Sequence, residues 1–200
     1  MNKVINIFPT PVYVDYLNRP LNQYELDYIK KCKSEYYNNY GNLTSKSTYI
    51  LNDLPDLKNS IEQLIYDYTY NFLDYKKIVT PYITQSWLNY MYTNEYHHRH
   101  DHPNSFISGV LYINADKNFD SIKFHKNTYM QIKPDVNKYN DINCDDYYIS
   151  VNTGQCILFP SNLQHSVDYN KQNAERISLA FNVFLKGTLG SELYLTELKI

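Results

Sequence analysis

The feature that most constrains the fold is a change of sequence pattern near residue 78. Before it, two stretches, roughly 23–38 and about 55–75, carry apolar residues at helical spacing. After it, apolar residues fall in short runs rich in Val, Ile, Tyr and Phe, which is typical of strands. The candidate strands are 82–93, 106–114, 120–125, 128–133, 147–152, 155–159, 174–186 and 191–198. Two helices followed by about eight strands predict a mainly β fold, a β-sandwich or jelly roll backed by the two helices.

Local signals refine the beginning of the chain. Asn22, with Glu25 three residues later, forms a capping-box pattern, so we expect the first helix to begin there. Short strands are expected at Val4 to Phe8 and at Val12 to Tyr16, on either side of two prolines that cannot donate to a central ladder. The polar stretch Asn38 to Ser47 is expected to separate the first helix from the next element.

Length and composition predict one soluble domain. A chain of 200 residues can form one sizeable core, and we expect a single domain over 1–200, in which 1–78 supports a β core over 79–200. The formal net charge of −2 offers no basic surface for nucleic acid. We expect no membrane partner and no signal peptide, because apolar runs are short. Three scattered cysteines without a CxxC motif favour reduced thiols and a cytoplasmic location. The sequence does not indicate an oligomeric state.

Four of the six histidines lie within the segment 97–103. On an extended chain, His100 and His102 point to the same side and can converge, while Asp101 between them points away. Imidazole suits iron, zinc, copper or nickel, and two such ligands need at least one more. His165 follows an apolar run that leads into a loop, which is a usual place for a site residue. A lone HxH pair is more often a surface or structural feature, so the metal interpretation depends on the further elements.

One further element is a strongly β-patterned run around Arg176. Period-two alternation places Arg176, Ser178 and Ala180 on one face and apolar side chains on the other. An arginine that points into a barrel is costly unless an anion meets it. Its planar fork fits a carboxylate in bidentate fashion. The pattern therefore indicates an anionic co-substrate beside the metal.

Taken in order, these motifs resemble the 2-oxoglutarate/Fe(II)-dependent oxygenases, in the branch near the prolyl hydroxylases. Within that branch the chain is most similar to a group of oxygenases common in phage and bacterial genomes. The matching segments are Phe8–Pro11, Trp87–Asn89, His100–Ser105, Ser108–Asn114, Leu158–Ser161 through His165, and Arg176–Asn182. Together they cover nearly the whole chain, and their order makes the set specific.

The resemblance implies a double-stranded β-helix that binds Fe(II), 2-oxoglutarate and O2. His100 and His165 would take the two histidine positions of the facial triad. His102 would stand where most members of the superfamily have Asp or Glu, so the metal would be held by three neutral imidazoles. His97 and His98 are then expected to be loop or pocket residues.

The resemblance also implies a binding site for the co-substrate. Arg176 would pair with the far carboxylate of 2-oxoglutarate, helped by Ser178. Tyr112 occupies the place where prolyl hydroxylases use a strand tyrosine for that carboxylate. Asn89 is expected to line the pocket, and His125 is expected to be a surface residue.

The leading hypothesis is a dioxygenase that hydroxylates a C–H bond with release of succinate and CO2, acting on a peptidyl side chain or a small molecule. A three-histidine cupin-like dioxygenase without 2-oxoglutarate is an alternative, but Phe106 and Ile107 stand where a Glu is expected, and Arg176 has no role. A non-enzymatic phage binding or structural protein is another, which the acidic, exposed loop 134–146 would suit. A nucleic-acid demethylase of the AlkB type is disfavoured, because Asn182 replaces its second Arg.

Overall fold

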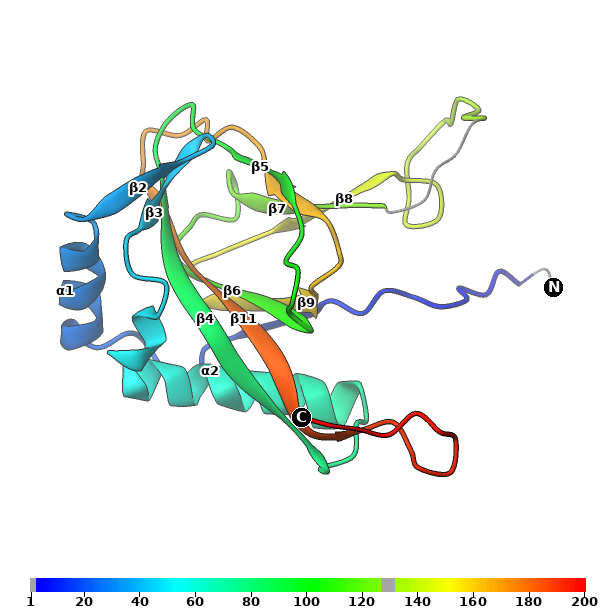
Figure 1. Cartoon of the computed structure of the whole chain (residues 1–200). Helices are drawn as coiled ribbons and strands as arrows, with labels where there is room; N and C mark the ends of the chain where they lie inside the picture. Colours follow the sequence, from blue (N-terminus) through cyan, green and yellow to red (C-terminus); the bar gives the residue numbers. More distant parts are fainter. Residues whose placement is uncertain (1–2, 127–131) are drawn as a thin grey trace.

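The computed structural model describes residues 3–126 and 132–200. Two β-sheets face each other, and the helices cover the outer face of the larger one (Figure 1). In order across the larger sheet, the strands are β1 (Tyr13–Tyr16), β9 (Gln155–Pro160), β6 (Ile107–Asn114), β11 (Arg176–Leu189), β4 (Val79–Met91), β3 (Asn42–Ser45) and β2 (Tyr36–Asn39), with β12 (Leu198–Lys199) paired to β11. The smaller sheet runs β5 (His97–His100), β10 (His165–Val167), β7 (Ser121–His125) and β8 (Asp146–Ser150). The fold is a double-stranded β-helix, or jelly roll, as the sequence predicts.

The centre of the larger sheet is the long antiparallel pair of β4 and β11. Its register runs from Arg176 opposite Met91 to Gly187 opposite Val79. On the other side of β11, Ser178 pairs with Tyr112 of β6. Directly opposed residues of antiparallel strands share a face, so this register decides which side chains point between the sheets.

Close packing at the centre of this sheet requires a glycine on β6. A Cβ atom on Gly109 would lie 2.2 Å from the ring of Phe181 and 2.8 Å from Leu158. Phe181 and Leu158 belong to the core beneath the helices and are fully buried. Glycine lets the phenylalanine ring cross β6 at a distance that no other residue type allows.

Two helices cover the outer face of the larger sheet. Helix α1 (Gln23–Cys32) begins with the predicted capping box, in which Asn22 accepts from the backbone N–H of Glu25 and Glu25 accepts from that of Asn22. Helix α2 (Pro55–Asp67) follows a short 3-10 turn, η1 (Ile50–Asn52), and continues as a π-helical turn, η2 (Tyr68–Phe72). None of the helices in the described ranges is long and apolar enough to cross a membrane.

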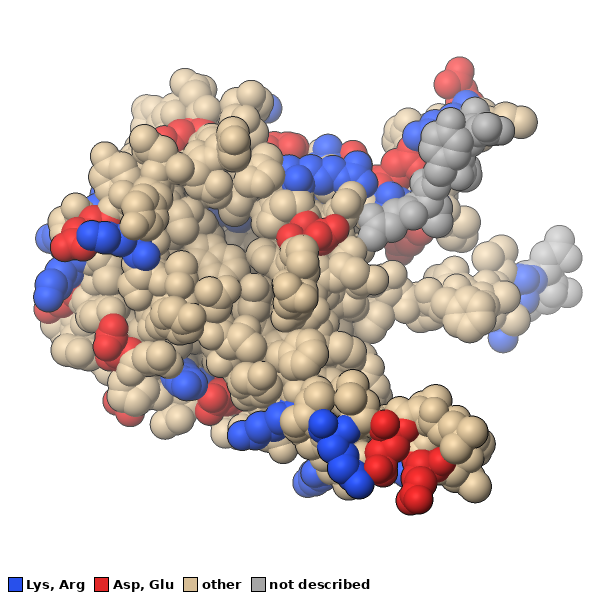
Figure 2. All heavy atoms as spheres, in the orientation of Figure 1, with Lys and Arg blue, Asp and Glu red and all other residues tan. Residues whose placement is uncertain are grey.

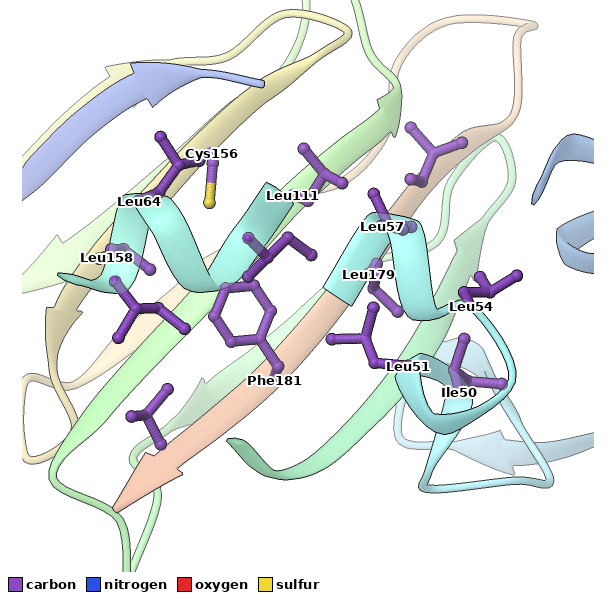
Figure 3. Close-up of a cluster of buried hydrophobic side chains, with 14 of the residues drawn as sticks. Ile50, Leu51, Leu54, Leu57, Leu64, Leu111, Cys156, Leu158, Leu179 and Phe181 are labelled. Carbon is purple, nitrogen blue, oxygen red and sulfur yellow. The ribbon is translucent and has the colours of Figure 1, made fainter. Parts of the chain in front are cut away.

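The main core lies between α2 and the larger sheet. Buried leucines from η1 and α2 meet the apolar face of β6, β9 and β11, where Leu111, Leu158 and Leu179 point toward the helix (Figure 3). Each fully buried leucine contributes about 1.5–3 kcal/mol relative to an exposed one. A second core between the two sheets contains Phe124 and Phe159. It fills only part of the space between the sheets.

Several predicted boundaries are wrong at the ends of the chain. The first helix ends at Cys32, and β2 and β3 form a hairpin where a polar spacer was expected, because pairing with β4 gives this segment a ladder. Residues 4–8 form no strand and are exposed. Most of 191–198 makes a turn, with only its last residue in β12. The predicted strand 128–133 lies mostly outside the described residues.

Charged side chains of both signs are mixed over the face seen in Figure 2. They lie mainly around its rim, and the centre of this face carries few of them. The N-terminal segment extends away from the two sheets, and the termini lie apart (Figure 1). Neither feature forms part of the cavity described below, whose lining residues all come from strands or their immediate continuations.

Candidate metal centre

Three of the predicted site histidines come together between the sheets. His100 is the last residue of β5 and lies directly opposite His165, the first residue of β10. The chain continues through Asp101 to His102, and one ligand atom from each of the three histidines lies within 4.8 Å of the others. The ring centroids are 4.3 Å apart for His100 and His165, and 5.0 Å apart for His100 and His102. Asp101 is exposed, as expected.

Backbone carbonyl groups orient two of these rings. Nδ1 of His100 lies 2.8 Å from the carbonyl oxygen of His98, and Nδ1 of His165 lies 3.1 Å from that of Leu163. A carbonyl oxygen can only accept, so each Nδ1 carries the hydrogen and each Nε2 presents a lone pair. This arrangement holds a metal-binding imidazole in one tautomer and one orientation.

Burial keeps the three imidazoles neutral. It lowers the pKa of His102 to about 4, with a smaller contribution from His100. Burial also lowers the pKa of His100, and it holds the pKa of His165 well below its usual value. Because a metal binds the neutral ring, the site is in its binding form at neutral pH. The edge of the Phe159 ring packs against His165 at a centroid distance of 4.7 Å and supports this burial.

The histidines form one wall of a cavity that lies between the two sheets. The opposite wall is the inner face of the larger sheet, where the register brings Asn89, Ser178 and Tyr112 into one row. The other residues that line the cavity from this sheet are Asn42, Trp87, Met91, Gly109, Val110, Phe159, Arg176, Ala180 and Phe181. All seven predicted site residues therefore line the same cavity.

Arg176 is buried in this cavity and keeps an N–H donor that is not hydrogen-bonded within the described residues. The residue is 4% exposed, and its Nε has no hydrogen-bond partner among the described residues. The guanidinium lies over the ring of Tyr112, with Cζ 5.2 Å from the centroid. The hydroxyl of Tyr112 is also buried and has no hydrogen-bond partner in the part of the chain that the structure describes, and burial raises the pKa of this hydroxyl to about 12, so it remains a donor. A carboxylate is the ligand that would satisfy both groups.

One residue near Arg176 could not be assigned to the site from the sequence. Asp120, in the turn before β7, is 5% exposed and places Oδ1 3.8 Å from Nε of Arg176. Its Oδ2 accepts from the backbone N–H of Asp116 and from Nε2 of Gln172, both at 2.8 Å. Asp120 partly balances the buried charge of Arg176. A single aspartate in a turn belongs to no motif, so only the fold reveals this contact.

The remaining histidines take different positions. His97 lines the cavity and stacks on His100 at a centroid distance of 4.5 Å, and its Nε2 lies 3.3 Å from Nδ2 of Asn39. The expectation of a surface position for His125 is wrong. The residue is 8% exposed, with Nδ1 2.7 Å from Asp146 and Nε2 2.9 Å from Ser166. Two partners on neighbouring strands of the smaller sheet fix this ring.

The family follows from a comparison with known proteins. A family model described as "Putative 2OG-Fe(II) oxygenase" matches residues 85–182, which include His100, His102, His165 and Arg176. Over these residues the chain matches the 2-oxoglutarate/Fe(II)-dependent oxygenase family. The match confirms the resemblance of the motifs to the 2-oxoglutarate/Fe(II)-dependent oxygenases. This family depends on Fe(II), 2-oxoglutarate and O2. No curated protein sequence matches the chain.

Solved structures share the fold of this chain at low sequence identity. An oxidoreductase of the 2OG-Fe(II) oxygenase family from Burkholderia pseudomallei is 14% identical with a TM-score of 0.58, and the match covers 86% of this chain and 83% of that one. A prolyl hydroxylase from Trichoplax adhaerens, in complex with a hypoxia inducible factor peptide fragment, is 14% identical with a TM-score of 0.59, and the match covers 86% of this chain and 83% of that one. HygX from Streptomyces hygroscopicus, with nickel, 2-oxoglutarate and hygromycin B bound, is 9% identical with a TM-score of 0.58, and the match covers 87% of this chain and 82% of that one.

Proposed function

We propose that this oxygenase hydroxylates a C–H bond of its primary substrate, with release of succinate and CO2. Iron would be held by His100, His102 and His165, and the far carboxylate of 2-oxoglutarate by Arg176. The observation that carries the proposal is the shared cavity. Three neutral imidazoles converge on one side of it, and a buried guanidinium with a free donor lies on the other.

The donor set fits Fe(II). Imidazole nitrogen is a common ligand for this metal, and a third neutral histidine in place of a carboxylate leaves one more positive charge on the ion. That charge favours chelation of dianionic 2-oxoglutarate. Asp101 does not replace His102 in this role, because its carboxylate is exposed and lies 3.4 Å from Nε2 of Gln164. When bound, the iron and its co-substrate supply the oxygen-activation chemistry.

The protein residues bind and orient the co-substrate. Arg176 and the hydroxyl of Tyr112 offer donors to the far carboxylate, and Ser178 lies beside them on β11. Asn89 occupies the next strand and lines the same cavity. Apolar side chains on both walls reduce the access of water, which strengthens charge-assisted hydrogen bonds in the site.

A peptidyl side chain is the substrate class that we favour for the hydroxylation. The motif resemblance is to the prolyl-hydroxylase branch, and one structure with the same fold is a prolyl hydroxylase bound to a peptide fragment. A small molecule is the competing class, since HygX binds hygromycin B in the same fold. Trp87 and Met91 line the cavity and offer apolar contacts to either class.

Succinate formation tests the proposal directly. Purified protein supplied with Fe(II), 2-oxoglutarate, ascorbate and O2 is expected to form succinate, and Arg176→Ala is expected to abolish it. Arg99→Ala is the matched control, because Arg99 is exposed on β5 and points its Nε to Gln164. A protein that forms no succinate and does not bind 2-oxoglutarate when metal-loaded would refute the proposal.

A further inference from the structure

Asn42 presents an unpartnered acceptor inside the cavity. It is the first residue of β3, directly after the turn formed by Tyr40 and Gly41. The residue is 3% exposed and lines the cavity, and its Oδ1 has no hydrogen-bond partner among the described residues. Its Nδ2 donates to Oδ1 of Asn89 at 3.4 Å, and Thr44 donates to the same oxygen at 3.2 Å.

The hairpin does not need this side chain for its own structure. The β2–β3 ladder is complete from Tyr36 opposite Ser45 to Asn39 opposite Asn42, and β3 continues onto β4. The hydrogen bond from Asn42 to Asn89 is long, and Oδ1 of Asn89 already accepts a shorter hydrogen bond from Thr44. A buried carbonyl without a donor costs free energy that an apolar residue would not. A ligand that supplies the donor accounts for an asparagine at this position.

The position of Asn42 separates it from the co-substrate site. Across the sheet the strands run β6, β11, β4, β3, so Tyr112 lies on one side of the Arg176 strand and Asn42 on the other. Thr44 pairs with Asn89, which places Asn42 beside Met91, the residue opposite Arg176. The donors of Arg176 and Tyr112 therefore lie on β11 and β6, and the free acceptor of Asn42 lies beyond β4 on β3.

The charges around the cavity restrict the missing donor. Among the described residues that line it, Arg176 is the only charged side chain, and no carboxylate is present. A buried ammonium group would have no counter-ion beside Asn42 and would pay its full desolvation penalty. An uncharged N–H or O–H group meets the acceptor without that penalty.

We infer that Asn42 is a specificity-determining residue that accepts a hydrogen bond from an uncharged N–H or O–H group of the primary substrate, such as a carboxamide, a peptide amide or a hydroxyl. This inference rests on the proposed function, because it assigns the primary-substrate side of the same cavity. Met91 beside it, and Trp87 farther along β4, supply apolar contact area in the same cavity, while the amide oxygen selects the polar group.

Thermal melting of the metal-free protein tests the acceptor without any ligand. Asn42→Leu removes the unpartnered carbonyl, and we expect its Tm to rise by about 2–4 °C. Asn38→Leu, the same change at an exposed position of β2, is the control for added apolar surface and should leave Tm unchanged within about 1 °C. A lower Tm for Asn42→Leu than for wild type would mean that Asn42 is structural, and it would overturn the inference.

Matched fragments test the ligand class. The probes are benzamide against methyl benzoate, and benzyl alcohol against benzyl methyl ether, titrated by saturation-transfer NMR into protein loaded with Zn(II) and 2-oxoglutarate. Wild type should bind the donor-bearing member of each pair roughly tenfold more tightly, the effect of one satisfied hydrogen bond. Asn42→Leu should lose this preference, and Asn42→Asp, which keeps the acceptor, should retain it.

The two proposals fail in different ways. Wild-type protein that shows no donor preference, a preference that persists in Asn42→Leu, or binding of neither pair would overturn the assignment of Asn42. Calorimetric titration of the metal-free protein, first with Zn(II) and then with 2-oxoglutarate, reports on the proposed function instead. Loss of that binding in wild type would refute the oxygenase site, while the melting test of Asn42 would still give its own result.

Discussion

Replacing Arg176 with alanine should remove most of the affinity for 2-oxoglutarate without unloading the metal. The guanidinium is buried, and its distance of 3.8 Å from Asp120 is too long for a hydrogen bond. Two charge-assisted bonds to a carboxylate contribute about 1.5–3 kcal/mol each. Their joint loss of about 3–6 kcal/mol corresponds to a Kd roughly 10²–10⁴ times higher. Arg176→Lys keeps the charge but not the planar fork, so its loss should be smaller, about 10–100-fold.

Calorimetric titration of 2-oxoglutarate into anaerobic, Fe(II)-loaded protein measures these constants. Asp120 loses its nearest cation in Arg176→Ala, but its Oδ2 keeps the donors from Asp116 and Gln172. The circular dichroism spectrum and the Fe(II) stoichiometry should therefore match wild type. A Kd within threefold of wild type would refute the role of Arg176. Weaker co-substrate binding that comes with lost metal binding would point to a damaged cavity instead.

Three further perturbations follow from the geometry. Because burial lowers the pKa of His102 to about 4, the unfolded chain binds a proton that the folded protein excludes as pH falls below about 6.5. His102 alone should then lower the metal-free stability by up to about 3 kcal/mol between pH 6.5 and 4 in urea titrations, and His100 and His165, whose pKa values burial also lowers, add to this drop; a flat profile down to pH 4 would contradict this. His102→Ala should raise the Fe(II) Kd at least about tenfold, whereas His102→Asp and the control His98→Ala should keep binding; equal affinity in His102→Ala would remove it from the ligand set. Gly109→Ala places a Cβ against the Phe181 ring, which should cost about 1–3 kcal/mol and lower Tm by about 3–10 °C, and an unchanged melt would show that the ring can move aside.

The parts of the fold that the sequence predicts correctly are those with a strong period. Alternation along β11 places Arg176 on the inner face, and the apolar stripe of α2 gives the helix that packs beneath the sheet. The HxH spacing gives two converging rings because that segment is extended. In each case the local pattern and the tertiary structure demand the same side-chain direction.

The parts that the sequence does not predict depend on partners far along the chain. Strands β5 and β10 are short and polar, so they exist through pairing with each other and with β7 rather than through any periodicity. The β2–β3 hairpin is hidden because Tyr36 continues the helical spacing of α1. Asp120 and Asn42 belong to no motif, and only the fold brings Asp120 to Arg176 and Asn42 to the cavity. Tertiary pairing overrides local preference at all of these positions.

The direct pairing of His100 with His165 gives a bound metal a second, mechanical role. An ion shared by His102 and His165 would be a removable cross-link that closes a chain loop of roughly 60 residues, and a link of that length reduces the entropy of the unfolded chain by the equivalent of about 4 kcal/mol. The strands that it joins have only four and three residues. Chelation would therefore loosen the smaller sheet first, and amide hydrogen exchange in β5 and β10 would rise while the helix-covered sheet stays protected.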